Sequence, residues 1–388
     1  MDTVDAIELG FDPDRLNHLT TVIKEDVAHE QYYDGAVVMV ARSGAVVLQE
    51  ALGFAERATR RAMRLDDVFH LFSVTKALTT VAVLQRIDRG ELSLTHRVVD
   101  IIPEFGCRGK QRVTVAQLLT HTAGMSAGVP PVSPDQMGHL ETVVAAVCQQ
   151  GLEALPGQEV SYSPLVAHAV LAEIVRRVDG GRRRFCEILE EEIFHPLGMQ
   201  DTALGLRKDF AERRVPVVVR DKSEGLFPPS MLESFNFLLT EEAEIPAGGA
   251  LSTAADIFRF AEMLRCGGEL GETRILSPAI IELATTNHTG LQPNNLWNYT
   301  RDVRGWDEFP AYLGLSFFLR GMGIFPTYFG TMASPGTFGS MGAGSTIFWI
   351  EPERDLTFVC LTAGLLEESR SMDRFQRLSD LVLAAVVD

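Results

Sequence analysis

The apolar positions of the chain follow different periods in different segments, and these periods predict its first elements. Residues 14–30 carry apolar side chains at helical spacing, which predicts an amphipathic helix. Two β-rich runs follow, 35–41 and 45–54, joined by the short glycine-containing sequence 42–44. A short connection of this kind between two such runs predicts a β-hairpin.

Apolar residues then dominate a longer helical stretch. Residues 77–87 are apolar on nearly every side of a helix, so we expect a helix buried in the middle of the protein. Farther along, β-branched runs are few, and helical patterns alternate with long loops, near 141–149, 165–178 and 185–194. We interpret the whole stretch 92–240 as a helical insertion.

Strand-like runs return near the C-terminus, at 312–320, 345–350 and 357–362, and an amphipathic helix is expected over about 372–387. Strands near both ends of a chain with a helical middle predict an α+β fold. We therefore expect an antiparallel sheet, built from the N- and C-terminal segments and flanked by helices.

The chain is long enough, at 388 residues, for one large domain or two ordinary ones. The element pattern favours two. Residues 1–91 and 241–388 are expected to form the sheet domain, and residues 92–240 an inserted helical domain.

Composition and charge narrow the class of protein. Hydrophobic residues make up 46% and charged residues 22%, as in a globular protein. The net charge of −17 argues against a nucleic-acid partner, because phosphate binding needs a positive field. No apolar run is long enough to span a membrane, and the first residues lack the pattern of a signal peptide. The five cysteines form no Cys-x-x-Cys pair, so we expect a reducing cytoplasm.

The strongest candidate for chemistry is Ser73, three residues before Lys76. Positions i and i+3 of a helix share one face, so the hydroxyl and the amine can meet. The first turn also favours developing negative charge on Ser73. Lysine is rare here, with five against thirty arginines, and only lysine can lose its proton near neutral pH. The alternative is a capping serine beside a lysine that reaches solvent.

Two further segments can complete such a site. Tyr162, on a loop before a helix, can act as a base and then as an acid, because a nearby lysine stabilises a phenolate. The glycine-rich sequence 338–346 leads into a strand, and an N–H of that strand can join the N–H of Ser73 in binding an oxyanion. Taken singly, a loop tyrosine is more often a packing residue, and a glycine-rich turn is usually only a turn.

The order of these motifs resembles the serine β-lactamase-like family, the group of class C β-lactamases, penicillin-binding proteins and family VIII carboxylesterases. Ser-x-x-Lys stands at residue 73, Tyr-Ser at 162 and a glycine-rich strand start near 340. Further stretches are also similar, at 118–125, 196–199 and 246–256, and the resemblance covers about residues 14–387.

The resemblance implies a specific set of site residues. It implies an acyl-enzyme on Ser73, with Lys76 and Tyr162 as the pair that handles the proton. It also implies that the backbone N–H groups of Ser73 and Ala343 form the oxyanion hole. Ser340 and Gly342 then belong to the substrate-binding strand.

The chain departs from the family pattern at two motifs. In β-lactamases an asparagine stands two places after the tyrosine, where this chain has Pro164. Their third motif begins with lysine or histidine followed by Thr-Gly, where this chain reads Ser340-Met341-Gly342. Without that cation a substrate carboxylate loses its partner, so neutral esters or amides fit better than penicillins or D-Ala-D-Ala peptides.

Other classes of site find little support. The nine histidines are dispersed without metal-ligand spacing, no Gly-x-Ser-x-Gly elbow is present, and no cofactor or metal is expected. The segment 309–332 contains many large apolar residues. These residues belong to core strands or, where they lie on loops, line an apolar acyl or alcohol pocket.

The predicted function is a carboxylesterase acting through an acyl-enzyme on a neutral, small-molecule ester. An acyltransferase, an amidase or a peptidase can use the same intermediate, and a catalytically weak binding or scaffold protein is the remaining alternative. We expect no nucleic-acid or membrane partner, and the oligomeric state stays open.

Overall fold

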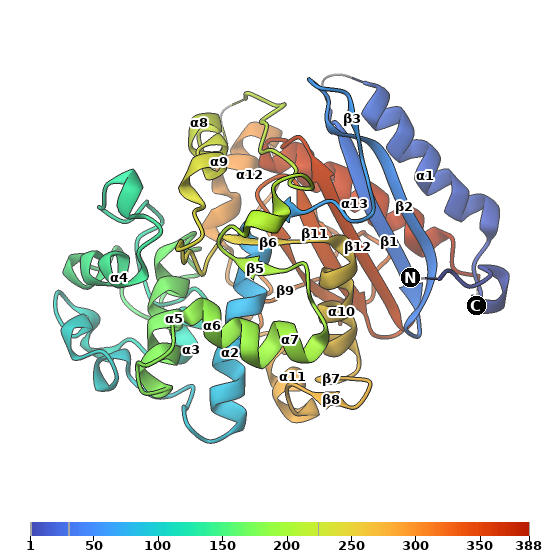
Figure 1. The fold of residues 1–388 in the computed structure, drawn as a ribbon. Helices are drawn as coiled ribbons and strands as arrows, with labels where there is room; N and C mark the ends of the chain where they lie inside the picture. The colour runs from blue at the N-terminus through green and yellow to red at the C-terminus, as the bar shows by residue number, and fades with distance from the viewer. Residues whose placement is uncertain (1, 30–31, 224, 388) are drawn as a thin grey trace.

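An antiparallel sheet of seven strands organises the computed structural model, which describes residues 2–29, 32–223 and 225–387. Its order is β3-β2-β1-β12-β11-β10-β9 (Figure 1). The strands are β1 (Gly35–Arg42), β2 (Ala45–Glu56), β3 (Arg61–Ala62), β9 (Phe318–Leu319), β10 (Phe338–Gly342), β11 (Thr346–Glu351) and β12 (Leu356–Ala363). The sheet is thus built from N- and C-terminal segments, which confirms the predicted α+β fold.

The two ends of the chain meet inside this sheet. β1 lies between β2 and β12, with Gly35 opposite Ala363 and Arg42 opposite Leu356. The β1–β2 hairpin was predicted, and its turn residues Ser43 and Gly44 have positive φ angles of 52° and 81°. A turn of this handedness matches the twist of the two strands.

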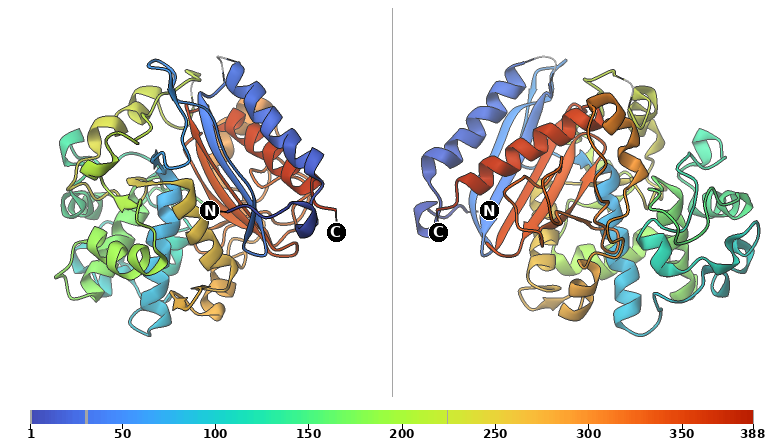
Figure 2. Two further views of the ribbon diagram at one scale, coloured as in Figure 1. Left: turned by 45° about the vertical axis from the view of Figure 1, so that its right-hand side comes forward. Right: turned by 180° about the vertical axis from the view of Figure 1, so that it is seen from behind.

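Helices cover both faces of the sheet (Figure 2). α1 (Pro13–Ala28) and α13 (Glu368–Ala384) pack side by side on one face, and α10 (Ala254–Arg265) packs against β11 and β12 on the other. The predicted helix 14–30 ends at Ala28, and residue 30 lies outside the described residues. α13 begins before the predicted 372, because the Glu367 carboxylate caps the N–H groups of the first turn.

The helix α2 (Thr75–Asp88) lies between the sheet and the helical region (Figure 1). Every side chain from Thr75 to Arg86 is buried, which confirms the predicted buried helix. Its main helical neighbour is α5 (Val166–Val178). The helical region also contains α3 (Val115–Leu119), α4 (Leu140–Gln149), α6 (Phe185–Leu189), a π-helical turn (Glu190–Phe194), α7 (His195–Leu197), α8 (Pro229–Glu233) and α9 (Phe235–Leu238).

Short elements complete the chain. A three-stranded sheet joins β4 (Phe69–His70), β6 (Ala250–Ser252) and β5 (Ala203–Leu204), and the remaining elements are β7 (Glu269–Leu270), β8 (Thr273–Arg274), α11 (Pro278–Ala284) and α12 (Asn298–Arg304). No helix in the described ranges combines the length and the apolar character that crossing a membrane requires. The domain boundaries stay a prediction, and the ranges 1–91, 92–240 and 241–388 each include a position outside the described residues.

One predicted strand is wrong over most of its length. Residues 312–320 were expected to be extended, but only Phe318–Leu319 form a strand. Tyr312 and Ser316 have φ angles of 43° and 62°, in the left-handed region that interrupts an extended chain. The apolar pattern arises instead from a folded-back segment whose side chains are buried.

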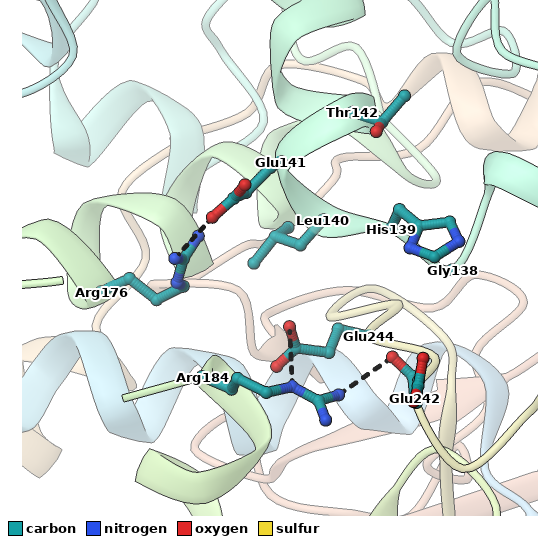
Figure 3. Close-up of a pocket in the computed structure, with 9 residues that line it drawn as sticks. All are labelled: Gly138, His139, Leu140, Glu141, Thr142, Arg176, Arg184, Glu242 and Glu244. Atoms are coloured by element: carbon teal, nitrogen blue, oxygen red, sulfur yellow. Dashed lines mark hydrogen bonds and ion pairs between the residues drawn. The ribbon is translucent and has the colours of Figure 1, made fainter. Parts of the chain in front are cut away.

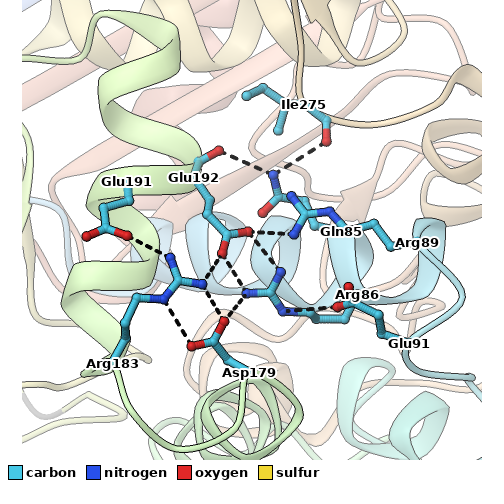
Figure 4. A network of polar contacts seen from close by, with 9 residues as sticks. All are labelled: Gln85, Arg86, Arg89, Glu91, Asp179, Arg183, Glu191, Glu192 and Ile275. Atoms are coloured by element: carbon cyan, nitrogen blue, oxygen red, sulfur yellow. Dashed lines mark hydrogen bonds and ion pairs between the residues drawn. The ribbon is translucent and has the colours of Figure 1, made fainter.

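An ion-pair network fixes the C-terminal end of α2 (Figure 4). Arg86 is 2% exposed and its guanidinium lies 2.8 Å from the carboxylate of Glu192. Glu192 also pairs with Arg89 and Arg183, and Asp179 lies 3.5 Å from Arg86. The network joins α2 to the π-helical turn, so it holds the helix that carries Lys76 at its other end.

We expect Glu192→Gln to lower the free energy of unfolding by about 3 kcal/mol, because it leaves buried Arg86 without its main partner. Urea unfolding measures this, with Glu190→Gln as the control, since Glu190 is exposed and pairs only with exposed His195. An equal, small change in both variants would contradict the expectation.

The network also predicts a pH dependence of stability. Burial alone raises the pKa of Glu192, but hydrogen bonds from Arg86, Arg183 and Arg89 lower it to about 2. A carboxyl whose pKa is lower in the folded state stabilises the fold above its unfolded pKa. That contribution is lost as the pH falls from about 4.5 towards 2, and Glu192→Gln should lack this part of the acid transition.

Candidate active site

Ser73 lies in a tight 3₁₀ turn, Phe72–Val74, directly before α2. Phe72 has a φ angle of 47°, an uncommon conformation for a large side chain, so the backbone turns sharply just before the serine. The end of β10 packs against this turn. A side chain on Gly342 would lie 2.2 Å from the carbonyl oxygen of Leu71, so only glycine allows the approach.

Lys76 lies beneath Ser73 in the first turn of α2. Its Nζ is 3.0 Å from Ser73 Oγ and 2.8 Å from the carbonyl oxygen of Ala247. The side chain is 3% exposed, and burial lowers the pKa of Lys76 to about 7. The amine therefore loses its proton near neutral pH, and its lone pair can then accept a proton from Ser73.

Tyr162 completes a cluster of three side chains. Lys76 Nζ lies 5.2 Å from the centre of the Tyr162 ring, and the Tyr162 side chain is hydrogen-bonded to Ser73. Burial raises the pKa of Tyr162 to about 12, against a smaller opposing effect of the bond with Ser73. A nearby lysine was expected to stabilise a phenolate. The buried ring instead keeps its proton, because desolvation disfavours the charged form.

Hydrogen bonds from distant segments hold the tyrosine loop. Asn295 Oδ1 accepts the N–H of Tyr162 at 2.8 Å, and Asn295 Nδ2 donates to Ser161 Oγ at 2.7 Å. His121 Nδ1 accepts the N–H of Ser163 at 3.1 Å. Burial, with a contribution from Lys76, lowers the pKa of His121 to about 3, so its ring is neutral and can accept. His121 and Asn295 thus both support the loop that carries Tyr162.

The glycine-rich segment forms strand β10, where the sequence predicted a turn leading into a strand. Phe338 pairs with Ile350 and Gly342 with Thr346. Ala343 and Gly342 line the same pocket as Ser73. Ser340 does not line it: the side chain is buried, and its hydroxyl lies 3.5 Å from the carbonyl oxygen of Ser73.

Two cavities meet at Ser73. The first is lined by Tyr162, Gly342 and Ala343 together with apolar and aromatic side chains that include Trp297, Phe318 and Tyr328. The second cavity also reaches Ser73 and Ala343 and is lined by apolar residues: Phe72, Pro164, Leu165, Phe227, Met231, Leu232 and Phe235 with Ala247 and Gly248.

The aromatic segment 309–332 contributes both to the core and to the first cavity. Phe318 and Tyr328 line the first cavity, whereas Leu315 and Phe317 belong to the core. The first cavity is lined mostly by apolar and aromatic side chains.

A separate cavity beside α4 has a different character (Figure 3). Arg176 pairs with Glu141 at 2.8 Å, and Arg184 lies 3.8 Å from Glu244 and donates to the carbonyl oxygen of Glu242. Both arginines of this cavity are thus engaged by neighbouring oxygen atoms, and none of the predicted site residues lines it. Within the described ranges, no group of three His, Cys, Asp or Glu side chains is placed to hold a metal ion.

Comparison with known proteins gives a consistent result. The family described as Beta-lactamase matches residues 19–381. The chain is 30% identical to the esterase EstB of Burkholderia gladioli over 304 residues, covering 70% of this chain and 76% of that protein. It is 29% identical to penicillin-binding protein 4 of Amycolatopsis lactamdurans, covering 73% and 74% of the two chains.

Solved structures show the same fold. A penicillin-binding protein homologue from Caulobacter crescentus superposes with a TM-score of 0.80 at 25% identity, covering 97% of this chain and 99% of that one. A family VIII carboxylesterase superposes with a TM-score of 0.78 at 22% identity, covering 98% and 99% of the two chains.

Proposed function

The chain belongs to the beta-lactamase family, and we propose that within this serine hydrolase family it is a carboxylesterase that forms an acyl-enzyme on Ser73. The observation that carries the proposal is the contact of 3.0 Å between Ser73 Oγ and the buried amine of Lys76. A serine becomes a nucleophile when an adjacent base takes its proton, and burial makes Lys76 such a base near pH 7.

In the proposed acylation, neutral Lys76 accepts the hydroxyl proton as Ser73 Oγ bonds to the ester carbonyl carbon. The N–H groups of Ser73 and Ala343 donate hydrogen bonds to the oxyanion that results. Tyr162 then donates its proton to the leaving alkoxide as the carbon–oxygen bond breaks, and Lys76 returns a proton to the Tyr162 oxygen. The pKa of about 12 at Tyr162 suits this role, since the group stays protonated until an alkoxide needs the proton.

Deacylation repeats these steps with water as the nucleophile. Tyr162 accepts a proton from the water and passes its own proton to neutral Lys76 as the water oxygen bonds to the acyl carbon. Lys76 then returns that proton to Ser73 Oγ as the bond between the acyl carbon and Ser73 Oγ breaks and the acid leaves. An alcohol or an amine in place of water would give the acyltransferase alternative with the same residues.

Neutral esters fit the charges around Ser73. Ser340 supplies no cation where the family pattern has one, and among the described residues no lysine or arginine lines either cavity at Ser73. A substrate carboxylate would therefore be buried without a partner, which is costly. The similarity to an esterase supports this reading. The similarity to a penicillin-binding protein keeps an amidase or peptidase as the second candidate.

The test is intact mass after brief incubation with p-nitrophenyl butyrate, with release of p-nitrophenol followed in the same sample. We expect release together with a transient butyryl adduct on Ser73. A chromogenic cephalosporin, which carries a carboxylate, serves as the matched β-lactam substrate and should be turned over far more slowly. Faster turnover of the cephalosporin would favour a β-lactamase, and a folded protein with neither adduct nor release would favour a binding protein.

The proposed compartment is the cytoplasm. All five cysteines are free, and two of them, Cys148 and Cys360, are buried. Free thiols persist in a reducing environment, whereas secreted proteins usually oxidise them in pairs.

A further inference from the structure

One charged side chain lines the first cavity at Ser73. Among the described residues of that lining, Glu368 alone carries a carboxyl or a basic group, and the other polar side-chain groups are the hydroxyls of Ser73, Tyr162 and Tyr328 and the indole N–H of Trp297. Glu368 is the first residue of α13, so its carboxylate enters the cavity from the helix that packs behind the sheet. Glu368 is half-buried, and this desolvation raises the pKa of its carboxyl, so a cation beside it would stabilise the charged form.

The carboxylate is held in place by the backbone. Its Oε2 accepts the N–H of Leu226 at 3.1 Å. A side chain at Gly225 would lie 2.4 Å from the same oxygen, so a glycine there allows the approach. These contacts fix the position of Glu368 but supply no charge to balance it.

The acidic neighbours of Glu368 are engaged elsewhere. The Glu367 carboxylate caps the N-terminus of α13, and Asp221 pairs with Arg370 at 3.2 Å. No ion pair joins Glu368 to a lysine or arginine of the described chain, and the charged groups nearest to it are themselves acidic. The missing positive charge can therefore come from a ligand.

Aromatic rings share the cavity with this carboxylate. Trp297 lies 5.8 Å from Tyr328 and 6.3 Å from Phe318, measured between ring centres, and all three line the cavity. Aromatic rings attract cations, and a cluster of rings with a carboxylate recognises alkylammonium groups in particular. The net charge of −17 adds a long-range attraction for cations.

We propose that this cavity binds an alkylammonium group on the alcohol part of the ester, with Glu368 as the residue that determines this specificity. The inference rests on the proposed esterase function and names its substrate class. Tyr162 places the alcohol here, because the proposed proton donor to the leaving group lines this cavity and not the apolar second one. The second cavity then takes the acyl chain.

The experiment compares two esters of nearly equal shape, butyrylcholine and 3,3-dimethylbutyl butyrate, which differ in the charge of the alcohol. We expect the kcat/KM of the wild-type protein to be about tenfold higher for butyrylcholine than for 3,3-dimethylbutyl butyrate. One site that combines a cation–π contact with an ion pair provides a preference of about this size. Glu368→Gln should remove most of this preference, by raising KM for butyrylcholine much more than KM for the neutral ester. The amide oxygen of glutamine can still accept the N–H of Leu226, so the loop is retained.

The matched control is Glu353→Gln, which removes the same charge from the exposed turn between β11 and β12. This control substitution should leave the kcat/KM for both esters unchanged. If Glu368→Gln lowered the kcat/KM equally for both esters, Glu368 would be a structural residue and the proposal would be overturned. Equal kcat/KM of the wild-type protein for the two esters would also overturn it.

A binding measurement separates this inference from the esterase itself. Choline titrated into the protein should change the tryptophan fluorescence, because Trp297 lines the cavity, and Glu368→Gln should weaken that binding about tenfold. Binding of choline without hydrolysis of any ester would reject the esterase function and keep the cation site. Hydrolysis of the neutral ester without choline binding would keep the esterase function and reject the cation site.

Discussion

The Ser73→Ala protein is expected to lose all covalent labelling by a serine-directed phosphonate and to lose ester turnover by at least about 10³-fold. The reagent needs a nucleophilic oxygen, and alanine supplies none. Folding should be retained, because the hydroxyl is hydrogen-bonded only to Lys76 and Tyr162 among the described residues, and Lys76 keeps its bond to the carbonyl oxygen of Ala247. Intact mass after labelling and circular dichroism measure the two properties.

The matched control for this substitution is Ser340→Ala. Ser340 is a second buried serine, and its hydroxyl lies 3.5 Å from the carbonyl oxygen of Ser73. Its substitution should leave phosphonate labelling in place. Undiminished labelling of Ser73→Ala would mean that another residue is the nucleophile.

The second large effect is expected at Lys76. Lys76→Met keeps a side chain of similar length in the buried site but removes the base, so ester turnover should fall by about 10²- to 10⁴-fold. Lys76→Arg should fall as far, because arginine keeps its proton at any working pH. A small effect of Lys76→Arg would show that the positive charge, and not a neutral amine, is what the reaction uses.

The same base predicts the pH profile of the wild-type protein. Burial lowers the pKa of Lys76 to about 7, and only the deprotonated amine can accept a proton. The value of kcat/KM for a neutral ester should therefore rise as the pH increases through about 7 and then level off. The residual activity of Lys76→Met should lack this rise. A profile with the same midpoint in both proteins would assign the titration to another group.

Local patterns predicted much of the fold. The β-rich runs 35–41 and 45–54, joined by a short glycine-containing connection, placed the hairpin, and the apolar run 77–87 placed the buried helix, because apolar side chains mark buried elements. The segment 312–320 failed for the same reason: its residues are buried, but two left-handed backbone positions fold it back, and burial alone cannot reveal them.

Part of the candidate site could be predicted from the sequence in the same way. Ser73 and Lys76 are one helical turn apart, so their spacing alone indicated contact, and Tyr162 was found through the order of motifs. Asn295 and Glu368 were missed because each reaches the site by a long-range contact, to Tyr162 and to Leu226. A single asparagine in a loop and a glutamate at a helix start carry no local signal of such a contact.

The pairing of β1 with β12 has a consequence for how the chain is made. Within the described residues β1 is the first strand and β12 the last, so during synthesis the edge of β1 that pairs with β12 stays open until β12 has been made. Open edges template association with other chains, and pairings between distant segments form slowly. The yield of folded protein should therefore depend more on the completion of β12, and on chaperones that protect the open edge until then, than on the stability of the finished sheet.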